Sequence, residues 1–395
     1  MASSADGLNV VDVAIHVNTA GSDGNHGGFA SGDEITGEVV VTTPEDVHVR
    51  KVDVFFTGRS QTCIDSIIAP GPVSTKKRFL KLRRRVRTFT SNPDGSWPIP
   101  FSFLVPHALD PAACSCVSLP DDHLQLPPTM GGNHSWEHAG QLLDDPTPDM
   151  VDICYKIVAR VEVSDSQGRC ACTETHTKLC VVPSFPEPPP SFSSEYRIRE
   201  EKGVRRSILT GRLGCLVMEA QTPSALKGIK SDGATLVSTK VLVRFDPASH
   251  DCAPPAPEDI MRKIQATSTW KIGPKGTSSN GQTTYAMTRA YTEAISLPPF
   301  HLAGAKWLKR SPGWEHMQVS NGHAAPADLI APSSGYIGGV YYLLKLAIPV
   351  ELPPGKVLVP TFHSCLVSRT YELEVALLLS SAASITVRVP LHICT

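Results

Sequence analysis

The sequence lacks the segments that direct a chain into or across a membrane. No stretch of its 395 residues approaches the roughly 20 continuous apolar residues of a membrane-spanning helix. The first ten residues lack the charged and apolar regions of a signal peptide. The 11 cysteines are odd in number and have no framework-like spacing, which fits a reducing compartment better than a disulfide scaffold. We therefore expect a cytoplasmic protein, or one peripheral at membranes.

The chain also lacks a strong net charge and the common catalytic signatures. A formal charge of −1 gives no global attraction to nucleic acid or membrane, so an electrostatic partner has to be met by a local patch. No G-x-S-x-G elbow, Walker loop or dinucleotide-binding fingerprint occurs. These features favour a non-catalytic protein, and we expect no cofactor and no metal site.

What is present is a period-two alternation of apolar residues, which is typical of β-strands. Gly32-Asp33 forms a predicted turn into a strand over residues 35–41. After the next turn, the alternation changes phase between Val49 and Val52, which predicts a β-bulge at Arg50-Lys51. Further strands are predicted at residues 11–17, 153–163, 213–217, 241–245, 264–272, 340–350, 371–379 and 385–393.

A proline-rich segment divides the chain. Five prolines fall between residues 183 and 190, and such a run stops regular structure and favours an extended conformation. The length of the chain predicts two domains. We therefore predict an all-β protein with two consecutive antiparallel immunoglobulin-like β-sandwich lobes, residues 1–183 and 197–395, joined by a Pro-rich linker at residues 184–196.

Several stretches together resemble one family. "GDEITGEVVVTTPEDVHVRKVDVFFTGRSQTCI" and "CYKIVARVEV" are similar to strands of the N-terminal lobe of arrestin-like proteins. "SCLVSRTYELEVALLL" and "SITVRVPLHI" resemble the final strand pair of the C-terminal lobe in fungal members. The order of the pieces also agrees, so the chain resembles an α-arrestin-related protein of the fungal type.

The resemblance implies a cytosolic adaptor that binds membrane cargo or other proteins in trafficking or signalling. Alpha-arrestins recruit WW-domain ubiquitin ligases through PPxY motifs. This chain has no PPxY, and its nearest approach is Pro189-Pro190-Ser191-Phe192, with phenylalanine in place of tyrosine. A stiff linker is the competing interpretation of that segment. Since the sequence ends at Thr395, directly after the last predicted strand, we expect no effector tail and no ligase recruitment.

The densest run of charge is "KKRFLKLRRRVRTF", residues 76–89. Leu80, Leu82 and Val86 share one parity, which predicts a strand with a basic outer face. Such a face is suited to anionic lipid headgroups or a phosphorylated segment, and the competing interpretation is a charged edge that prevents aggregation. Nucleic acid is not expected, because the run is short and has little aromatic interleaving. The candidate residues are Lys76, Lys77, Arg78, Lys81, Arg83, Arg84, Arg85 and Arg87.

An alternative function is an enzyme or small-molecule binder with its site at the interface between the lobes. The residues that would supply acid or base chemistry there are His123, His134, His138, Asp144 and Asp145. "HSWEH" (134–138) matches a zinc-hydrolase pattern, but flanking glycines leave no room for the helix that pattern needs. "DDPTPD" (144–149) reads as a solvated acidic loop, since its prolines prevent a helix. The C-x-C pairs at 114–116 and 170–172 are expected to be plain thiols. A retromer-type subunit, with a related double sandwich, is a third alternative.

Overall fold

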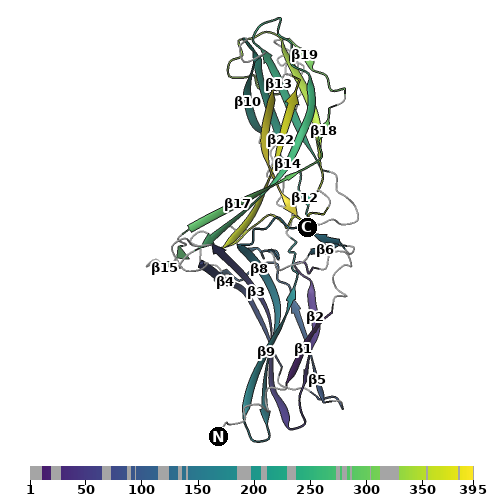
Figure 1. Cartoon of the computed structure of the whole chain (residues 1–395), viewed down its shortest axis with the longest axis vertical. Coiled ribbons are helices and arrows are strands. Elements are labelled where there is room, and N and C mark those ends of the chain that lie inside the picture. Colours follow the sequence, from purple (N-terminus) through teal and green to yellow (C-terminus); the bar gives the residue numbers. More distant parts are fainter. Residues whose placement is uncertain are drawn as a thin grey trace, which may run out of the picture.

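The fold is built almost entirely of β-strands, as the computed structural model of the chain shows (Figure 1). It describes residues 11–18, 28–64, 73–86, 90–93, 95–113, 124–131, 136–138, 141–184, 197–205, 211–228, 237–272, 276–277, 283–284, 287–302, 304–311, 329–352, 355–380 and 383–394. Within these ranges helical residues occur only as short 3-10 turns, among them η2 (Pro111–Ala113), so the predicted all-β class is confirmed. In the same ranges, no helix has the length and apolar character to cross a membrane.

The N-terminal half, residues 12–179, contains two antiparallel sheets. The first has the order β1-β2-β5, with β1 (Asp12–Val17), β2 (Glu34–Thr42) and β5 (Ser96–Leu104). The second has the order β4-β3-β8-β9, with β4 (Val73–Val86), β3 (Val47–Ile64), β8 (Val151–Asp165) and β9 (Cys170–Leu179). A short hairpin joins β6 (Trp136–His138) to β7 (Gln141–Leu143). The rings of Phe56 on β3 and Phe103 on β5 lie 6.1 Å apart, so the inner faces of the two sheets pack together.

The C-terminal half, residues 197–394, also has two main sheets. One has the order β10-β11-β13-β20-β19, with β10 (Arg197–Arg205), β11 (Arg212–Gln221), β13 (Val237–Pro247), β20 (Tyr341–Val350) and β19 (Leu308–Arg310). The other has the order β17-β14-β22-β21, with β17 (Met287–Ser296), β14 (Pro257–Ile272), β22 (Val367–Leu379) and β21 (Phe362–His363). Two further strands belong to this sheet. The strand β18 (Phe300–His301) pairs with β14, and β23 (Ser384–Leu391) pairs with β22. The remaining pairs are β12 (Leu226–Lys227) with β24 (Ile393–Cys394), and β15 (Gly276–Thr277) with β16 (Thr283–Thr284).

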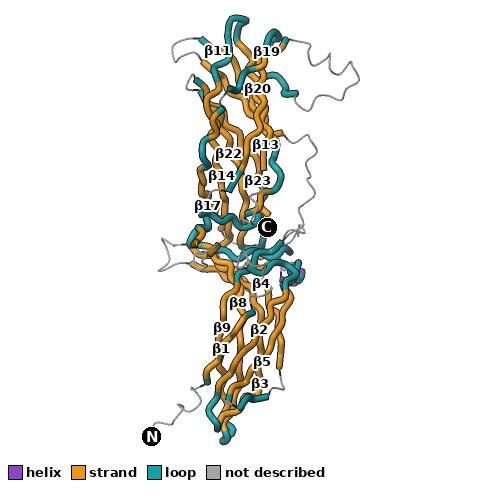
Figure 2. Tube along the Cα trace, turned by 90° about the vertical axis from the view of Figure 1, so that its right-hand side faces the viewer, coloured by secondary structure: helices purple, strands orange, loops and turns teal. Residues whose placement is uncertain are grey.

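The two halves lie end to end in an elongated molecule (Figures 1 and 2). Each half has its own apolar core. The core of the N-terminal half nevertheless includes Trp270 and Ile272 from the end of β14, Val367 from the start of β22 and Leu366 just before it. The Thr62 hydroxyl on β3 also donates a hydrogen bond to the Lys271 carbonyl, at 2.9 Å. Two long strands of the C-terminal half therefore complete the core of the other half.

Two irregularities of β3 determine which side chains share a face. The pairing of β3 with β8 shifts between Val49 and Lys51, so the bulge predicted at Arg50-Lys51 is confirmed. A second shift, between Gly58 and Arg59, occurs in the pairing with β4. A Cβ at Gly58 would lie 2.4 Å from the Phe79 ring, so only glycine permits this close packing. The sequence prediction missed this second bulge, and because of it Phe79 and its neighbour in sequence, Leu80, are both buried.

Candidate functional site

The basic run forms β4, which is the edge strand of the β4-β3-β8-β9 sheet. Alternation along the strand and the bulge beside Phe79 decide which side chains point away from the core. Lys77 pairs with the buried Ser60, and Arg84 with the core residue Val54, so these two lie on the opposite parity from the rest of the run. Arg87 lies outside the described residues. The predicted basic outer face is thus made by Lys76, Arg78, Lys81, Arg83 and Arg85.

At one end of this face, acidic side chains neutralise the basic ones. Asp53 on β3 has a side chain only 4% exposed, and Arg83 and Arg85 of β4 donate hydrogen bonds to it. Lys51 lies 3.3 Å from the same carboxylate and 2.5 Å from Glu162 on β8. Two of the predicted binding residues are therefore already held in ion pairs within the chain.

The charges in this network stabilise one another against the cost of burial. Burial opposes ionisation of Asp53, but the hydrogen bonds from Arg83, Lys51 and Arg85 outweigh it and hold the carboxyl pKa below its usual value. The hydrogen bond to Glu162 raises the pKa of Lys51. Because the pKa of Asp53 is lowered, its contribution to stability is present above the unfolded-state pKa and is lost as the pH falls through the folded-state value.

The other end of the face has a strong excess of positive charge. In one row across the four strands, Lys81, Thr57, Lys156 and Lys178 lie side by side. The next two rows add Arg78 beside Arg59, and Lys76 beside Gln61 and Asp152. We call this group the basic end, and it consists of six basic side chains, Arg59, Lys76, Arg78, Lys81, Lys156 and Lys178, against Asp152 alone.

The basic end lies near the junction of the two halves, and aromatic packing fixes part of it. The Lys81 ammonium lies 4.8 Å from the centre of the Phe55 ring, and Arg83 lies 5.6 Å from it. These contacts explain why Phe55 is only 7% exposed although it points away from the core. The C-terminal end of β3, which carries Arg59 and Gln61, continues to Thr62 at the contact with Lys271. A ligand on the basic end would therefore lie close to both halves.

We expect the replacement Asp53→Asn to strengthen anion binding while weakening the fold. The change frees Arg83, Arg85 and Lys51 from their shared carboxylate, which extends the positive potential over the whole outer face. It should lower the free energy of unfolding by about 1 kcal/mol, because the nearly buried carboxylate loses charge-assisted hydrogen bonds whose partly exposed donors are screened by solvent. Urea unfolding would measure the loss, and vesicle sedimentation the gain. A variant that binds more weakly than wild type would contradict this account of the face.

The acidic loop at residues 144–149 is solvated only in part, since Asp144 and Asp149 are exposed as predicted but Asp145 is not. Asp145 was expected to be solvated, but its side chain is 8% exposed and lies 3.8 Å from Arg369 of β22, which is fully buried. Thr147 links the two, since it donates to Asp145 and accepts from Arg369. Asp144 forms an ion pair with Lys356 and exchanges backbone hydrogen bonds with Gly355 and Val357. The prolines do prevent a helix, yet the resulting extended loop is held against the C-terminal half.

The Asp145–Arg369 pair is incompletely satisfied. Arg369 Nε and Nη1, Asp145 Oδ1 and the hydroxyl of neighbouring Ser268 have no hydrogen-bond partner within the described structure. Burial raises the pKa of Asp145 more than Arg369 lowers it. A separate cavity, lined by Ser60, Phe79, Cys365 and other residues but not by this pair, has a volume of ≈10 Å³. That space fits about one water molecule and is too small for an organic substrate.

The other predicted site residues are not brought together in the described structure. His138 belongs to β6, a strand in a short hairpin. His123, His134, Pro189, Pro190 and Phe192 lie outside the described residues, as do Cys114 and Cys116. Cys170 and Cys172 are exposed free thiols on β9. No cluster of three or more potential metal ligands is found among the residues that are described.

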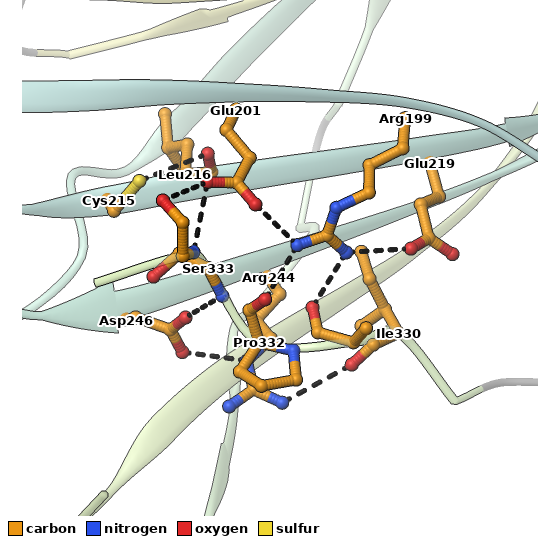
Figure 3. A network of polar contacts seen from close by, with 12 residues as sticks. Arg199, Glu201, Cys215, Leu216, Glu219, Arg244, Asp246, Ile330, Pro332 and Ser333 are labelled. Carbon is orange, nitrogen blue, oxygen red and sulfur yellow. Dashed lines mark hydrogen bonds and ion pairs between the residues drawn. The ribbon is translucent and has the colours of Figure 1, made fainter. Parts of the chain in front are cut away.

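Sequence reasoning missed one buried polar network in the C-terminal half (Figure 3). Arg244 on β13 forms an ion pair with Asp246 at 2.7 Å and lies 3.9 Å from the centre of the Tyr341 ring, although it is 1% exposed. Arg199 on β10 donates to the carbonyls of Ala331 and Pro332. These contacts fasten residues 330–336 over the outer face of the β11-β13-β20 sheet. The signal available in the sequence was a charged residue within the apolar run "VLVRF".

Comparison with known proteins identifies no relative. No protein-family model matches the chain, and no curated protein matches it.

Proposed function

We propose that the protein is a non-catalytic adaptor or scaffold that docks on anionic membrane surfaces through the basic end of its N-terminal half. The single observation that carries this proposal is the excess of six basic side chains over one acidic one in three adjacent rows of the sheet. The order of strand motifs that resembles arrestin-like proteins supports the adaptor role. We propose, on the same basis, that the two halves are arrestin-like immunoglobulin-like lobes and that protein cargo binds alongside the lipid.

The spacing of the charges suits a surface of lipid headgroups. Neighbouring strands lie about 4.8 Å apart, so the charges on β4, β3 and β8 fall within about 10 Å of one another, which is one Debye length at 0.1 M salt. Each basic residue near an anionic surface contributes about 1 kcal/mol. A flat sheet face presents these charges to one plane, which fits a membrane better than a narrow peptide.

The proposal is tested by sedimentation with vesicles of neutral phosphatidylcholine, with and without added phosphatidylserine. We expect wild type to bind only the anionic vesicles. Lys156→Ala should weaken that binding about fivefold, since it removes about 1 kcal/mol. The matched control is Arg160→Ala on the same strand, because Arg160 is already paired with Glu174 at 2.7 Å. Equal binding to both kinds of vesicle, or binding to neither, would refute docking on anionic membranes through the basic end. Binding only to a phosphorylated peptide would assign the face to a protein partner instead.

A further inference from the structure

The strand β17 is an exposed sheet edge without the usual protection. It pairs with β14 over its whole length, from Met287 with Ile272 to Ser296 with Lys263, and its register has no bulge. Every side chain from Met287 to Thr292 is exposed, so both faces of the strand are open there. No ladder joins its other edge to any described strand. Figures 1 and 2 show the strand at the margin of the molecule, near the junction of the halves.

Three of the other edge strands, β4, β10 and β5, carry features that discourage pairing. The edge strand β4 has seven basic residues, and β10 has six charged ones together with a bulge. The edge strand β5 contains Pro98 and Pro100, which have no amide hydrogen to donate. In contrast, β17 contains no proline and only two charged residues, Arg289 and Glu293. An edge of this kind is a template for another strand.

The hydrogen-bond phase of β17 shows which backbone groups remain available. The amide of Leu297 donates to Arg262 of β14 at 2.9 Å, in the same register as the ladder. Because donors alternate along an antiparallel strand, the odd-numbered residues of β17 bond to β14. The amides and carbonyls of the even-numbered residues therefore point toward the open edge, and these residues are Thr288, Ala290, Thr292, Ala294 and Ser296.

The sequence of this edge is complementary to itself when read in the opposite direction. If a second β17 lies antiparallel with Tyr291 opposite Tyr291, Arg289 faces Glu293 and Glu293 faces Arg289. Met287 then faces Ile295. All these pairs are odd-numbered, so on the open edge they fall at non-hydrogen-bonded positions, where Cα atoms approach to about 4.5 Å and side chains are closest. The hydrogen-bonded positions fall to the small even-numbered residues.

We propose that β17 is a homodimerisation edge, at which a second copy of the chain adds its own β17 antiparallel about a twofold axis at Tyr291. The two six-stranded sheets would then become one continuous sheet. Arg289 is exposed and has no ion-pair partner among the described residues, so it is available to the second copy. Glu293 is 32% exposed and lies 3.2 Å from Lys356, which leaves room for a second cation.

The pairing joins only one strand from each copy, so the dimer forms at micromolar or higher concentration rather than permanently. A dimer would present two basic ends to one membrane and raise the avidity of the proposed docking. The pairing itself does not depend on that function, because no residue of the basic end belongs to β17.

The test uses charge complementation in the full chain, followed by sedimentation equilibrium. Arg289→Glu and Glu293→Arg each place like charges opposite one another twice per dimer, so each variant alone should associate at least about tenfold more weakly than wild type. A 1:1 mixture of the two restores both opposite-charge pairs and should associate as wild type does. Lys240→Glu, at an exposed position of β13, changes the net charge equally and should have no effect.

A second measurement locates the axis. Mild oxidation of Tyr291→Cys should give a disulfide that joins position 291 to position 291 of a second copy, identified by mass spectrometry of the peptides. Ala290→Pro removes an outward-pointing amide without touching the ladder to β14, and it should abolish that cross-link. A chain that stays monomeric at high concentration would overturn the proposal. So would a dimer that ignores the single charge reversals, or a mixture that fails to reassociate.

Discussion

Simultaneous replacement of Lys76, Lys81 and Lys156 by alanine is expected to weaken binding to phosphatidylserine-containing vesicles by about 100-fold. Each lysine contributes about 1 kcal/mol near an anionic surface, and a total of about 3 kcal/mol corresponds to that ratio. The three residues come from β4 and β8 and lie in two of the three rows of the basic end. None of them has a carboxylate within ion-pair distance in the described structure, so no ion pair is lost with them, although Lys81 also covers the Phe55 ring.

The control for this result changes the net charge by the same amount at paired positions. Arg160, Arg169 and Arg388 form ion pairs with Glu174, Asp165 and Glu374. Replacing these three by alanine should change vesicle binding by less than about fivefold, since each arginine is already neutralised by its partner. An equal loss of binding in both triple variants would show that overall charge, and not the basic end, determines the interaction.

Arg369→Met is expected to lower the free energy of unfolding by about 3–5 kcal/mol. Arg369 is fully buried and faces the nearly buried Asp145, so the replacement leaves a carboxylate without a countercharge in the interior. The double variant Arg369→Met with Asp145→Asn removes both charges and should recover most of that loss. Equilibrium urea unfolding measures both. A single variant as stable as wild type would show that the pair contributes nothing to joining the halves.

The loss of unfolding free energy caused by Arg369→Met should depend on pH, and the titration of Asp145 determines in which direction. Burial raises the pKa of this carboxyl, so its contribution to stability is present below the unfolded-state pKa and is lost as the pH rises through the folded-state value. Arg369 lowers the pKa of Asp145, so its removal raises that pKa further. The loss of unfolding free energy should therefore be smaller near pH 5, where Asp145 is more readily protonated, than near pH 8. A loss independent of pH would contradict an ionised Asp145 in the variant.

The strands were predictable because one face of each is buried, and the alternation of apolar and polar residues in the sequence reflects that burial. The bulge at Arg50-Lys51 was visible for the same reason, since it shifts the phase of a long apolar pattern. The bulge at Gly58 was hidden, because it appears only when Phe79 of a different strand packs against the missing side chain. The position of that bulge decides which basic residues of β4 lie on the outer face of the sheet and which lie on the face toward the core.

Polar partners far apart in the sequence were the hardest to foresee. Asp145 reads as part of a hydrophilic loop, and only the fold brings it against Arg369 of β22. Asp53 likewise looks like one polar position in an apolar strand, yet it neutralises two members of the basic run. The sequence therefore predicted where the basic charge lies, while the three-dimensional pairing decided which of those charges remain available.

The most direct test of the basic end is lysine labelling in the presence of vesicles. With phosphatidylserine-containing vesicles, Lys76, Lys81, Lys156 and Lys178 should be protected from an amine-reactive reagent, as read by mass spectrometry, while Lys240 and Lys263 of the C-terminal half keep their reactivity. Neutral vesicles should protect none of them. Protection of the C-terminal lysines alone, or no protection of the basic end under conditions where the protein sediments with anionic vesicles, would contradict the proposed membrane-docking face.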